Sequence, residues 1–267
     1  DLGMKDEGIG ETEWAKKEKQ KLKDHSNKLI DENEQLRKKP EERQKREFEE
    51  LVGKDNATIE DFYYFGQYNK YKNMLRGTGV KVTELKNINE GQKYLIELLE
   101  TGNITVDQYE EMMDELQTGY GTIVPATNEA ILIENNIIDG IWKMPTNELK
   151  AIIAYTPIHE GQHLHDIKAG IVKDGEIVAS QKTAIRSLFK RLVEDYQQGK
   201  ISDESFKLAK RRLKQYRDEN TNQIDLKELK PIFGELMNAG IIDKDNPSLM
   251  LDIKSFINSI FKRNFKK

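Results

Sequence analysis

The sequence contains no cysteine among its 267 residues. This absence excludes disulfide bonds, thiolate metal ligands and a cysteine nucleophile. No apolar run approaches the roughly eighteen residues that a membrane helix needs, and residues 1–30 lack the apolar centre of a secretory signal. We therefore expect a soluble protein with no membrane partner. The chain begins at Asp1 rather than Met, as a processed product or a part of a larger protein would, and its localisation stays open.

A strong charge of one sign is also missing. Lys and Arg number 43, Asp and Glu number 47, and the net charge is -4, so no electrostatic feature favours binding to nucleic acid. There are only six prolines, while charged residues make up 34% of the chain and hydrophobic residues 36%. This composition favours amphipathic, well-solvated helices around a modest core. We predict an α+β fold that is mainly α.

The chain divides into four regions by composition and pattern. Residues 1–55 form a charged segment in which leucines recur every seven residues at Leu22, Leu29 and Leu36, a spacing that predicts a helix with one apolar seam. The polar residues between them favour a solvated helix that binds another surface, and a protein partner is one candidate. Residues 56–118 are predicted to be helical, residues 119–200 to form the core that carries the chemistry, and residues 201–267 to be helical again.

Two similar stretches each predict a helical hairpin. In each, a helix stops at a glycine, Gly102 or Gly199, and a second helix starts after Thr105 or Ser202. Glycine is the common residue after a helix end, and Thr or Ser is a common N-cap. The hairpins are therefore expected to be scaffold.

Short β-branched runs at residues 121–124 and 130–133 flank turn residues and predict a β-hairpin. A helix is expected to start near Thr146. Pro157 then either kinks one long helix or lies in the first turn of a shorter helix with Thr156 as its N-cap. Residues 158–165 are helical in both interpretations.

This helix carries the sequence His159-Glu160-Gly161-Gln162-His163. His159 and His163 are about 40° apart around a helix, so both imidazoles can meet one ion. Glu160 is offset by about 100° and can reach a water on that ion without being a ligand. Zinc with three protein ligands keeps a fourth position for water, and a nearby carboxylate can take the proton as that water attacks a carbonyl.

The third ligand is not fixed by the motif. His165 lies about 200° from His163 and points away from the ion. Asp166 returns to the face of His159 but nearly a turn further along, which suits a residue that orients a ligand. Asp174 falls in a turn, whereas Glu176 is expected to open the next helix, whose apolar face can hold it rigidly.

The motif, followed by a turn through Gly175 and by Glu176-Ile177-Val178-Ala179, resembles the zincin metallopeptidases. Within them it is similar to the gluzincins, including small domains of bacterial polymorphic toxins and phage virion proteins. The resemblance covers roughly residues 119–200. It implies a zinc metalloendopeptidase that acts on a polypeptide, one Zn²⁺ per chain held by His159, His163 and Glu176, and an edge strand before the motif helix.

Zincins stabilise the oxyanion with a His, Tyr or Arg side chain, and the resemblance leaves three candidates here: Tyr155, Tyr196 and Tyr120. The alternative function is a structural or interaction protein of a virion or secretion system, with an inactive zincin-like domain. Residues 218–228 resemble an EF-hand calcium loop but lack its turn glycine, so we predict a solvated helix connection there.

Overall fold

The computed structural model describes residues 46, 49–50, 57–217 and 223–243. The chain divides into two units, Asp1–Glu50 and Leu51–Lys267, and the architecture below is that of the second. The predicted N-terminal segment lies almost wholly outside the described residues, as does the centre of the calcium-like loop. Within the described part, no helix is long and apolar enough to cross a bilayer.

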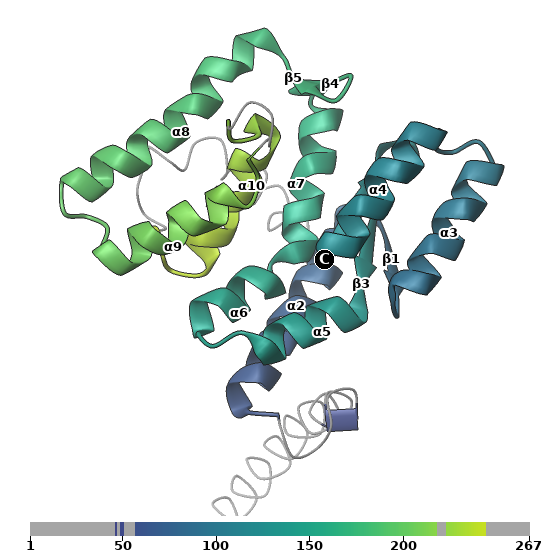
Figure 1. Ribbon diagram of the computed structural model, residues 1–267, viewed down its shortest axis with the longest axis horizontal. Helices are drawn as coiled ribbons and strands as arrows, with labels where there is room; N and C mark the ends of the chain where they lie inside the picture. The colour runs from purple at the N-terminus through teal and green to yellow at the C-terminus, as the bar shows by residue number, and fades with distance from the viewer. Residues whose placement is uncertain (1–45, 47–48, 51–56, 218–222, 244–267) are drawn as a thin grey trace, which may run out of the picture. The chain divides into compact units, whose positions relative to one another are not determined.

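The described residues form an α+β fold that is mainly α, as predicted. Figure 1 shows the helices around a small sheet. Their bounds are α2 (Ile59–Gly77), α3 (Ile88–Glu100), α4 (Val106–Thr118), α5 (Glu134–Lys143), α6 (Asn147–Ala154), α7 (Thr156–Lys168), α8 (Ala179–Gln197), α9 (Asp203–Lys214) and α10 (Leu226–Asn238).

The main sheet has three strands in the order β1-β3-β2. The predicted hairpin is confirmed: β2 (Gly121–Val124) pairs antiparallel with β3 (Glu129–Ile133), through a short turn that contains Pro125. The third strand, β1 (Lys81–Leu85), pairs parallel with β3 and falls within a region predicted to be helical. The local pattern missed it because β1 is short and half-exposed, and pairing with a distant strand decides its conformation.

The sheet lies between two helical layers. Helices α3 and α4 share a buried apolar cluster with β2 and β3 on one face, including Leu116, Val124 and Ile131. On the other face, Leu75 of α2 and Leu164 of α7 pack with Ala130 of β3. The motif helix α7 is therefore fixed directly against the sheet, next to its edge strand β2.

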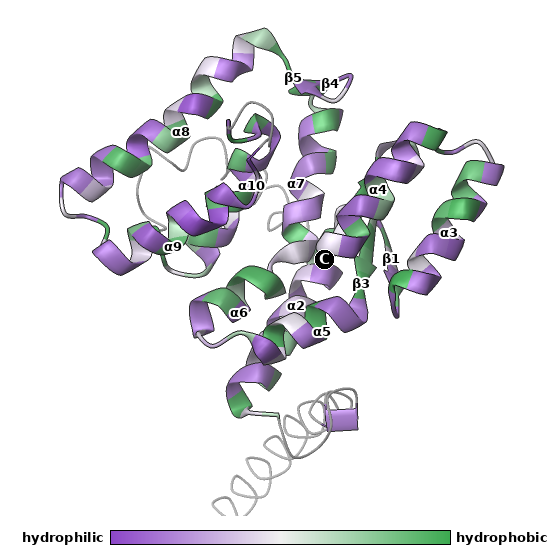
Figure 2. Ribbon diagram, in the orientation of Figure 1, coloured by the Kyte–Doolittle hydropathy of each residue, from purple (hydrophilic) through white to green (hydrophobic). Residues whose placement is uncertain are grey.

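The predicted hairpins α3–α4 and α8–α9 are both present. Gly102 and Gly199 each have φ +71° after the first helix, a conformation that glycine adopts without strain. The hydroxyls of Thr105 and Ser202 accept hydrogen bonds from the next turn and cap the second helix. Figure 2 shows hydrophilic and hydrophobic residues alternating along α8 and α9.

Pro157 begins a new helix rather than kinking a long one. Helix α6 ends at Ala154, and α7 starts at Thr156 with the proline in its first turn. The residue at the N-cap is Tyr155 rather than Thr156, whose hydroxyl instead donates to the carbonyl of Ile153. Proline at this position costs no hydrogen bond, because the first N–H groups of a helix have no partner within it.

A second apolar core joins the C-terminal helices to α6 and to a short hairpin of β4 (Val172–Lys173) and β5 (Glu176–Ile177). Its buried members include Leu188, Leu213 and Phe233, from α8, α9 and α10. Helix α10 contacts α7 along its length. The C-terminal region, predicted only as helical, thus packs against the motif helix.

Candidate metal centre

Helix α7 presents His159 and His163 on one face, as the spacing predicts. Both side chains are largely shielded from solvent, and their Nε2 atoms are 3.1 Å apart. Packing against the sheet on one side and against α10 on the other leaves the imidazoles little freedom. The two rings therefore converge on one point.

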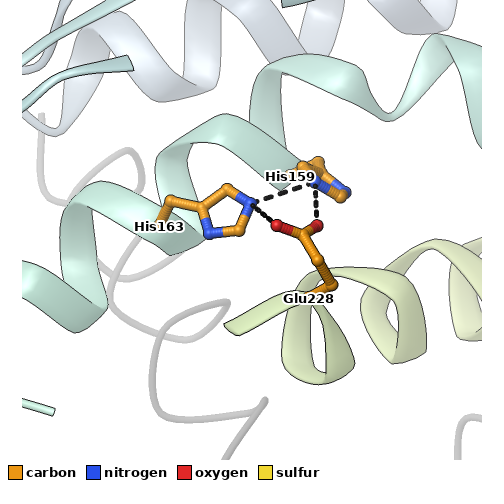
Figure 3. A group of neighbouring side chains, drawn as sticks. All are labelled: His159, His163 and Glu228. Carbon is orange, nitrogen blue, oxygen red and sulfur yellow. Dashed lines mark hydrogen bonds and ion pairs between the residues drawn. The ribbon is translucent and has the colours of Figure 1, made fainter. Parts of the chain in front are cut away.

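A third group reaches this point from α10. Glu228 Oε2 lies 3.3 Å from Nε2 of His159, and Glu228 Oε1 lies 3.5 Å from Nε2 of His163. One ligand atom from each residue lies within 4.8 Å of the others. Figure 3 shows the three side chains pointing toward one another, two from α7 and one from α10.

These separations fit a zinc ion. With zinc–ligand bonds of 2.0–2.2 Å, tetrahedral ligand atoms stand about 3.3–3.6 Å apart. The two Nε2 atoms are 3.1 Å apart, and one oxygen of Glu228 lies 3.3 Å from the first while its other oxygen lies 3.5 Å from the second. In addition, Glu228 Oε2 is buried without a hydrogen-bond partner among the described residues. Such an atom is costly unless something binds it. Two imidazoles and one carboxylate form a common zinc ligand set.

The electrostatics of the three groups are coupled. Burial opposes ionisation of Glu228, but the two histidines outweigh it and hold its pKa well below the ordinary value. Burial likewise disfavours protonated His163, yet Glu228 raises its pKa overall. The cluster therefore stabilises a positive charge next to the carboxylate. Either a protonated histidine or a bound cation can supply that charge.

The other ring nitrogen of His159 is also fixed. Its Nδ1 lies 2.7 Å from Oε1 of Glu235, which can only accept, so Nδ1 carries the proton and donates. When His159 is neutral, its Nε2 therefore offers a lone pair toward His163 and Glu228. Arg212 donates to both oxygens of Glu235, from Nε at 2.7 Å and Nη2 at 2.8 Å. This is the arrangement that fixes the tautomer of a metal-binding histidine.

Glu160 is the buried carboxylate beside the histidines. Burial raises its pKa, while the neighbouring histidines partly counteract the effect. Gly121 of β2 lies next to this carboxylate, since a Cβ built on Gly121 would be 3.4 Å from Cγ of Glu160, an ordinary van der Waals distance. The same Cβ would come within 2.7 Å of the carbonyl oxygen of Ile131, so the glycine allows the close pairing of β2 with β3.

A cavity of about 680 Å³ opens onto His159, His163 and Glu160. Its walls come from α4, from β2, from the turn between β4 and β5, and from the region joining α9 to α10. A volume of this size suits a ligand larger than an ion or a water molecule. The candidate centre is therefore accessible to a substrate.

Two predicted roles need correction. Glu176 was expected to open a helix and to bind the metal, but it lies on β5, α8 starts only at Ala179, and the exposed carboxylate pairs with Lys182 at 3.2 Å. The tight Asp174-Gly175 turn, with φ of 50° and 76°, keeps this segment in a hairpin. The group that the structure brings to the histidines is Glu228.

Asp166 does not orient a ligand either. Its Oδ1 accepts from the amide of Gln162 at 2.8 Å and lies 3.5 Å from the ammonium of Lys230 and 3.3 Å from Nδ1 of His165. Asp166 thus ties α7 to α10. The residue that contacts Nδ1 of a proposed metal-binding histidine is Glu235, on His159.

Of the three predicted tyrosines, only Tyr120 lines the cavity. Tyr155 is buried against Gly234 and Tyr71, and Tyr196 stacks on Phe206. These two act in packing.

A fourth tyrosine, Tyr216, was not predicted. Its ring lies against that of His159, with centroids 6.1 Å apart, and it lines the cavity.

The residues that the sequence interpretation missed come from α9, α10 and their connection. Glu228 was considered only as the end of a calcium-like loop. One signal was present: Glu228 and Glu235 are seven apart, about 20° from each other around a helix, beside the buried apolar residues Leu229, Ile232 and Leu236. Two carboxylates on a largely buried helix need partners, and the histidines of α7 are suitable ones.

The chain matches no protein-family model, no curated protein and no solved structure. Its function therefore has to be inferred from the geometry of this centre.

Proposed function

We propose that the chain is a zinc-dependent metalloendopeptidase of the zincin type. The observation that carries the proposal is the convergence of His159, His163 and Glu228, with Glu160 beside them, at the wall of a cavity large enough for a peptide. The gluzincin pattern of two histidines and a glutamate is kept, with Glu228 in place of Glu176. One Zn²⁺ per chain is expected.

A bound zinc ion would supply a Lewis acid that polarises water and the scissile carbonyl. Glu160 would take the proton of the attacking water and then deliver it to the leaving amine. Burial raises the pKa of Glu160, which strengthens it as a base for the first step. Glu235 would keep the proton of His159 on Nδ1 throughout.

The edge strand β2 offers a place for an extended substrate. The carbonyl of Tyr120 accepts from the N–H of Ile133, and hydrogen-bonded pairs alternate along antiparallel strands. By this alternation, the backbone groups of Gly121 and Ile123 face away from β3, and both residues line the cavity. A peptide strand added here would lie beside Glu160.

Stabilisation of the oxyanion is assigned to Tyr216, with Tyr120 as the alternative. The ring of Tyr216 lies against His159, whereas the hydroxyl of Tyr120 is directed at Gly140, where an added Cβ would come within 3.0 Å of it. Tyr216 is therefore the better placed hydroxyl for a carbonyl that reacts near the two histidines.

The test is a metal and activity assay on the full chain. Zinc content is measured after dialysis, and a peptide library is incubated with the protein and analysed by mass spectrometry. One zinc per chain together with cleavage that is absent in Glu160→Gln supports the proposal. A folded protein that takes up no zinc would refute it.

The second candidate is a structural or interaction protein with an inactive zincin-like domain. It is favoured by the contacts of Glu228 with both histidines, because a protonated histidine can satisfy that carboxylate without a metal. Such a protein would remain folded without zinc and would cleave no member of the library. Zinc uptake without any cleavage would also favour it over the peptidase.

A further inference from the structure

Glu235 is a buried carboxylate that contacts two side chains among the described residues. It is 1% exposed, near the C-terminal end of α10, and accepts from Nδ1 of His159 on one side and from Arg212 on the other. The guanidinium uses two nitrogens on the two carboxylate oxygens. This forked contact fixes the orientation of a carboxylate better than a point charge does.

Arg212 is itself held in place. Its Nη1 donates to Oε1 of Gln215 at 2.9 Å, and its guanidinium carbon lies 4.7 Å from the centroid of the Tyr216 ring. The same tyrosine ring stacks on His159 at an interplanar angle of 30°. The ring of Tyr216 therefore lies next to both Arg212 and His159 and helps to hold the guanidinium in place.

Two carboxylates of α10 lie next to the same histidine. Glu228 and Glu235 lie on one face of α10, and each is within 3.3 Å of a ring nitrogen of His159. A carboxylate in this position can serve as a metal ligand or as the acceptor for a ligand's N–H group. The contacts of Arg212 distinguish the two carboxylates, because its ion pair is with Glu235.

We propose that Arg212, on α9, is a positioning residue that determines which of the two carboxylates binds the metal. By holding both oxygens of Glu235, it keeps that carboxylate on Nδ1 of His159 and leaves coordination to Glu228. The inference rests on the proposed metal site. It means that the helical hairpin α8–α9, which contributes no ligand, sets the affinity of the site.

The consequence of losing Arg212 follows from geometry. Two nitrogens of Arg212 fix the orientation of the Glu235 carboxylate, and without them that carboxylate can rotate. Nδ1 of His159 then no longer has an acceptor that is held in one position. Loss of a group that orients a metal ligand weakens metal binding about 10- to 100-fold.

The experiment measures the Zn²⁺ dissociation constant of the full chain by competition with a chromophoric chelator. Arg212→Gln removes the charge, and Arg212→Lys keeps the charge but loses the fork. Arg211→Gln, the exposed neighbour on the same helix, is the matched control. Circular dichroism checks that each variant is folded, and Co²⁺ absorption spectra report any change in coordination.

We expect zinc binding to weaken about 10- to 100-fold in Arg212→Gln, less in Arg212→Lys, and not in Arg211→Gln. The Co²⁺ spectrum should change in Arg212→Gln. In a Glu235→Gln background, Arg212→Gln should have little further effect, because the two residues act through one contact.

The inference is overturned if wild type binds zinc and Arg212→Gln binds it within twofold, or if the effects of Arg212→Gln and Glu235→Gln simply add. If Arg212→Gln fails to fold, the same measurements are made on Arg212→Lys, alone and combined with Glu235→Gln. The same criteria for zinc binding and additivity then apply. A wild-type protein that binds no zinc refutes the proposed function itself, and the inference with it. The two failures are therefore distinguishable.

Discussion

Glu228 and Glu235 contact the two ring nitrogens of the same imidazole. Glu228 Oε2 lies 3.3 Å from Nε2 of His159, and Glu235 Oε1 lies 2.7 Å from Nδ1. An imidazole contacted at both ring nitrogens by carboxylates is held in one orientation, and the short contact to Glu235 places a proton on Nδ1. Glu228 is therefore placed to bind the metal and Glu235 to orient His159, and substitutions of the two residues should have different effects.

The first prediction concerns the third ligand. Glu228→Gln should weaken zinc binding by more than about 100-fold, because a neutral amide is a poor ligand for zinc and the other two ligands are histidines. Glu235→Gln should weaken it about 10- to 100-fold, since the amide oxygen can still accept from Nδ1 of His159. The measurement is the dissociation constant for Zn²⁺.

Glu176→Gln is the control for this series, because its carboxylate is exposed and pairs with Lys182. Its dissociation constant should equal that of wild type. If Glu235→Gln removes the zinc while Glu228→Gln retains it, the two carboxylates have been assigned in the wrong order. If Glu176→Gln removes it, the original assignment of the third ligand was right.

The second prediction separates binding from catalysis. Glu160→Gln should keep the zinc stoichiometry and lower kcat by several orders of magnitude, because the water then lacks its base. The zinc content and the single-turnover rate on a cleaved library peptide are the two readouts. Loss of zinc in this variant would mean that Glu160 is a ligand.

The sequence alone predicts those parts of the site whose residues lie close together in the chain. His159, Glu160 and His163 could be placed together because one turn of a helix fixes their relative positions. The hairpin β2–β3 and both helical hairpins were also predictable, since turn and cap residues mark them. All of these features depend on neighbours within a few residues.

Glu228 could not be predicted in the same way. It is brought to the histidines by the packing of α10 on α7, which depends on the apolar core around Phe233 rather than on any spacing in the chain. Glu176 is the sequence-based choice because it is expected to open a rigidly packed helix, yet the Asp174-Gly175 turn places it in a hairpin instead. Strand β1 was missed for the same reason, because its pairing with β3 is nonlocal.

The third prediction tests substrate binding at the sheet edge. Ile123→Pro removes an N–H group that faces the cavity and leaves the hydrogen bonds between β2 and β3 in place. Loss of one net hydrogen bond should raise KM by up to about tenfold with little change in zinc binding. Ile123→Val, which keeps the N–H group, is the control, and equal KM values for the two variants would argue against strand addition.

The fourth prediction concerns stability at acid pH. Asp61 on α2 is buried and pairs with Lys150 of α6. Burial opposes ionisation of Asp61, but hydrogen bonds from Lys150 and Thr58 outweigh it and lower its pKa. Replacing one partner of a buried pair leaves an uncompensated charge, so Asp61→Asn should cost about 3 kcal/mol at neutral pH.

The sign of the pH dependence follows from the lowered pKa. Because Asp61 is more acidic in the folded state, its contribution is present above the unfolded pKa of about 3.9 and is lost as the pH falls through the lower folded value. The free energy of unfolding of wild type, measured with denaturant, should therefore fall more steeply below about pH 4 than that of Asp61→Asn. The double variant Asp61→Asn with Lys150→Met should recover part of the loss, and equal slopes for wild type and Asp61→Asn would contradict the assignment.

The last prediction concerns the hydroxyl of Tyr216. Tyr216→Phe keeps the ring against His159 and under Arg212, so zinc affinity should stay within about twofold, but the donor for the oxyanion is lost. Removing one such donor lowers kcat about 10²- to 10³-fold. Tyr120→Phe is the matched comparison, because Tyr120 lines the same cavity with its hydroxyl toward Gly140. A larger loss of kcat in Tyr120→Phe than in Tyr216→Phe would transfer the role to Tyr120, whereas a weakened zinc site in Tyr216→Phe would show that the hydroxyl supports His159 rather than the substrate.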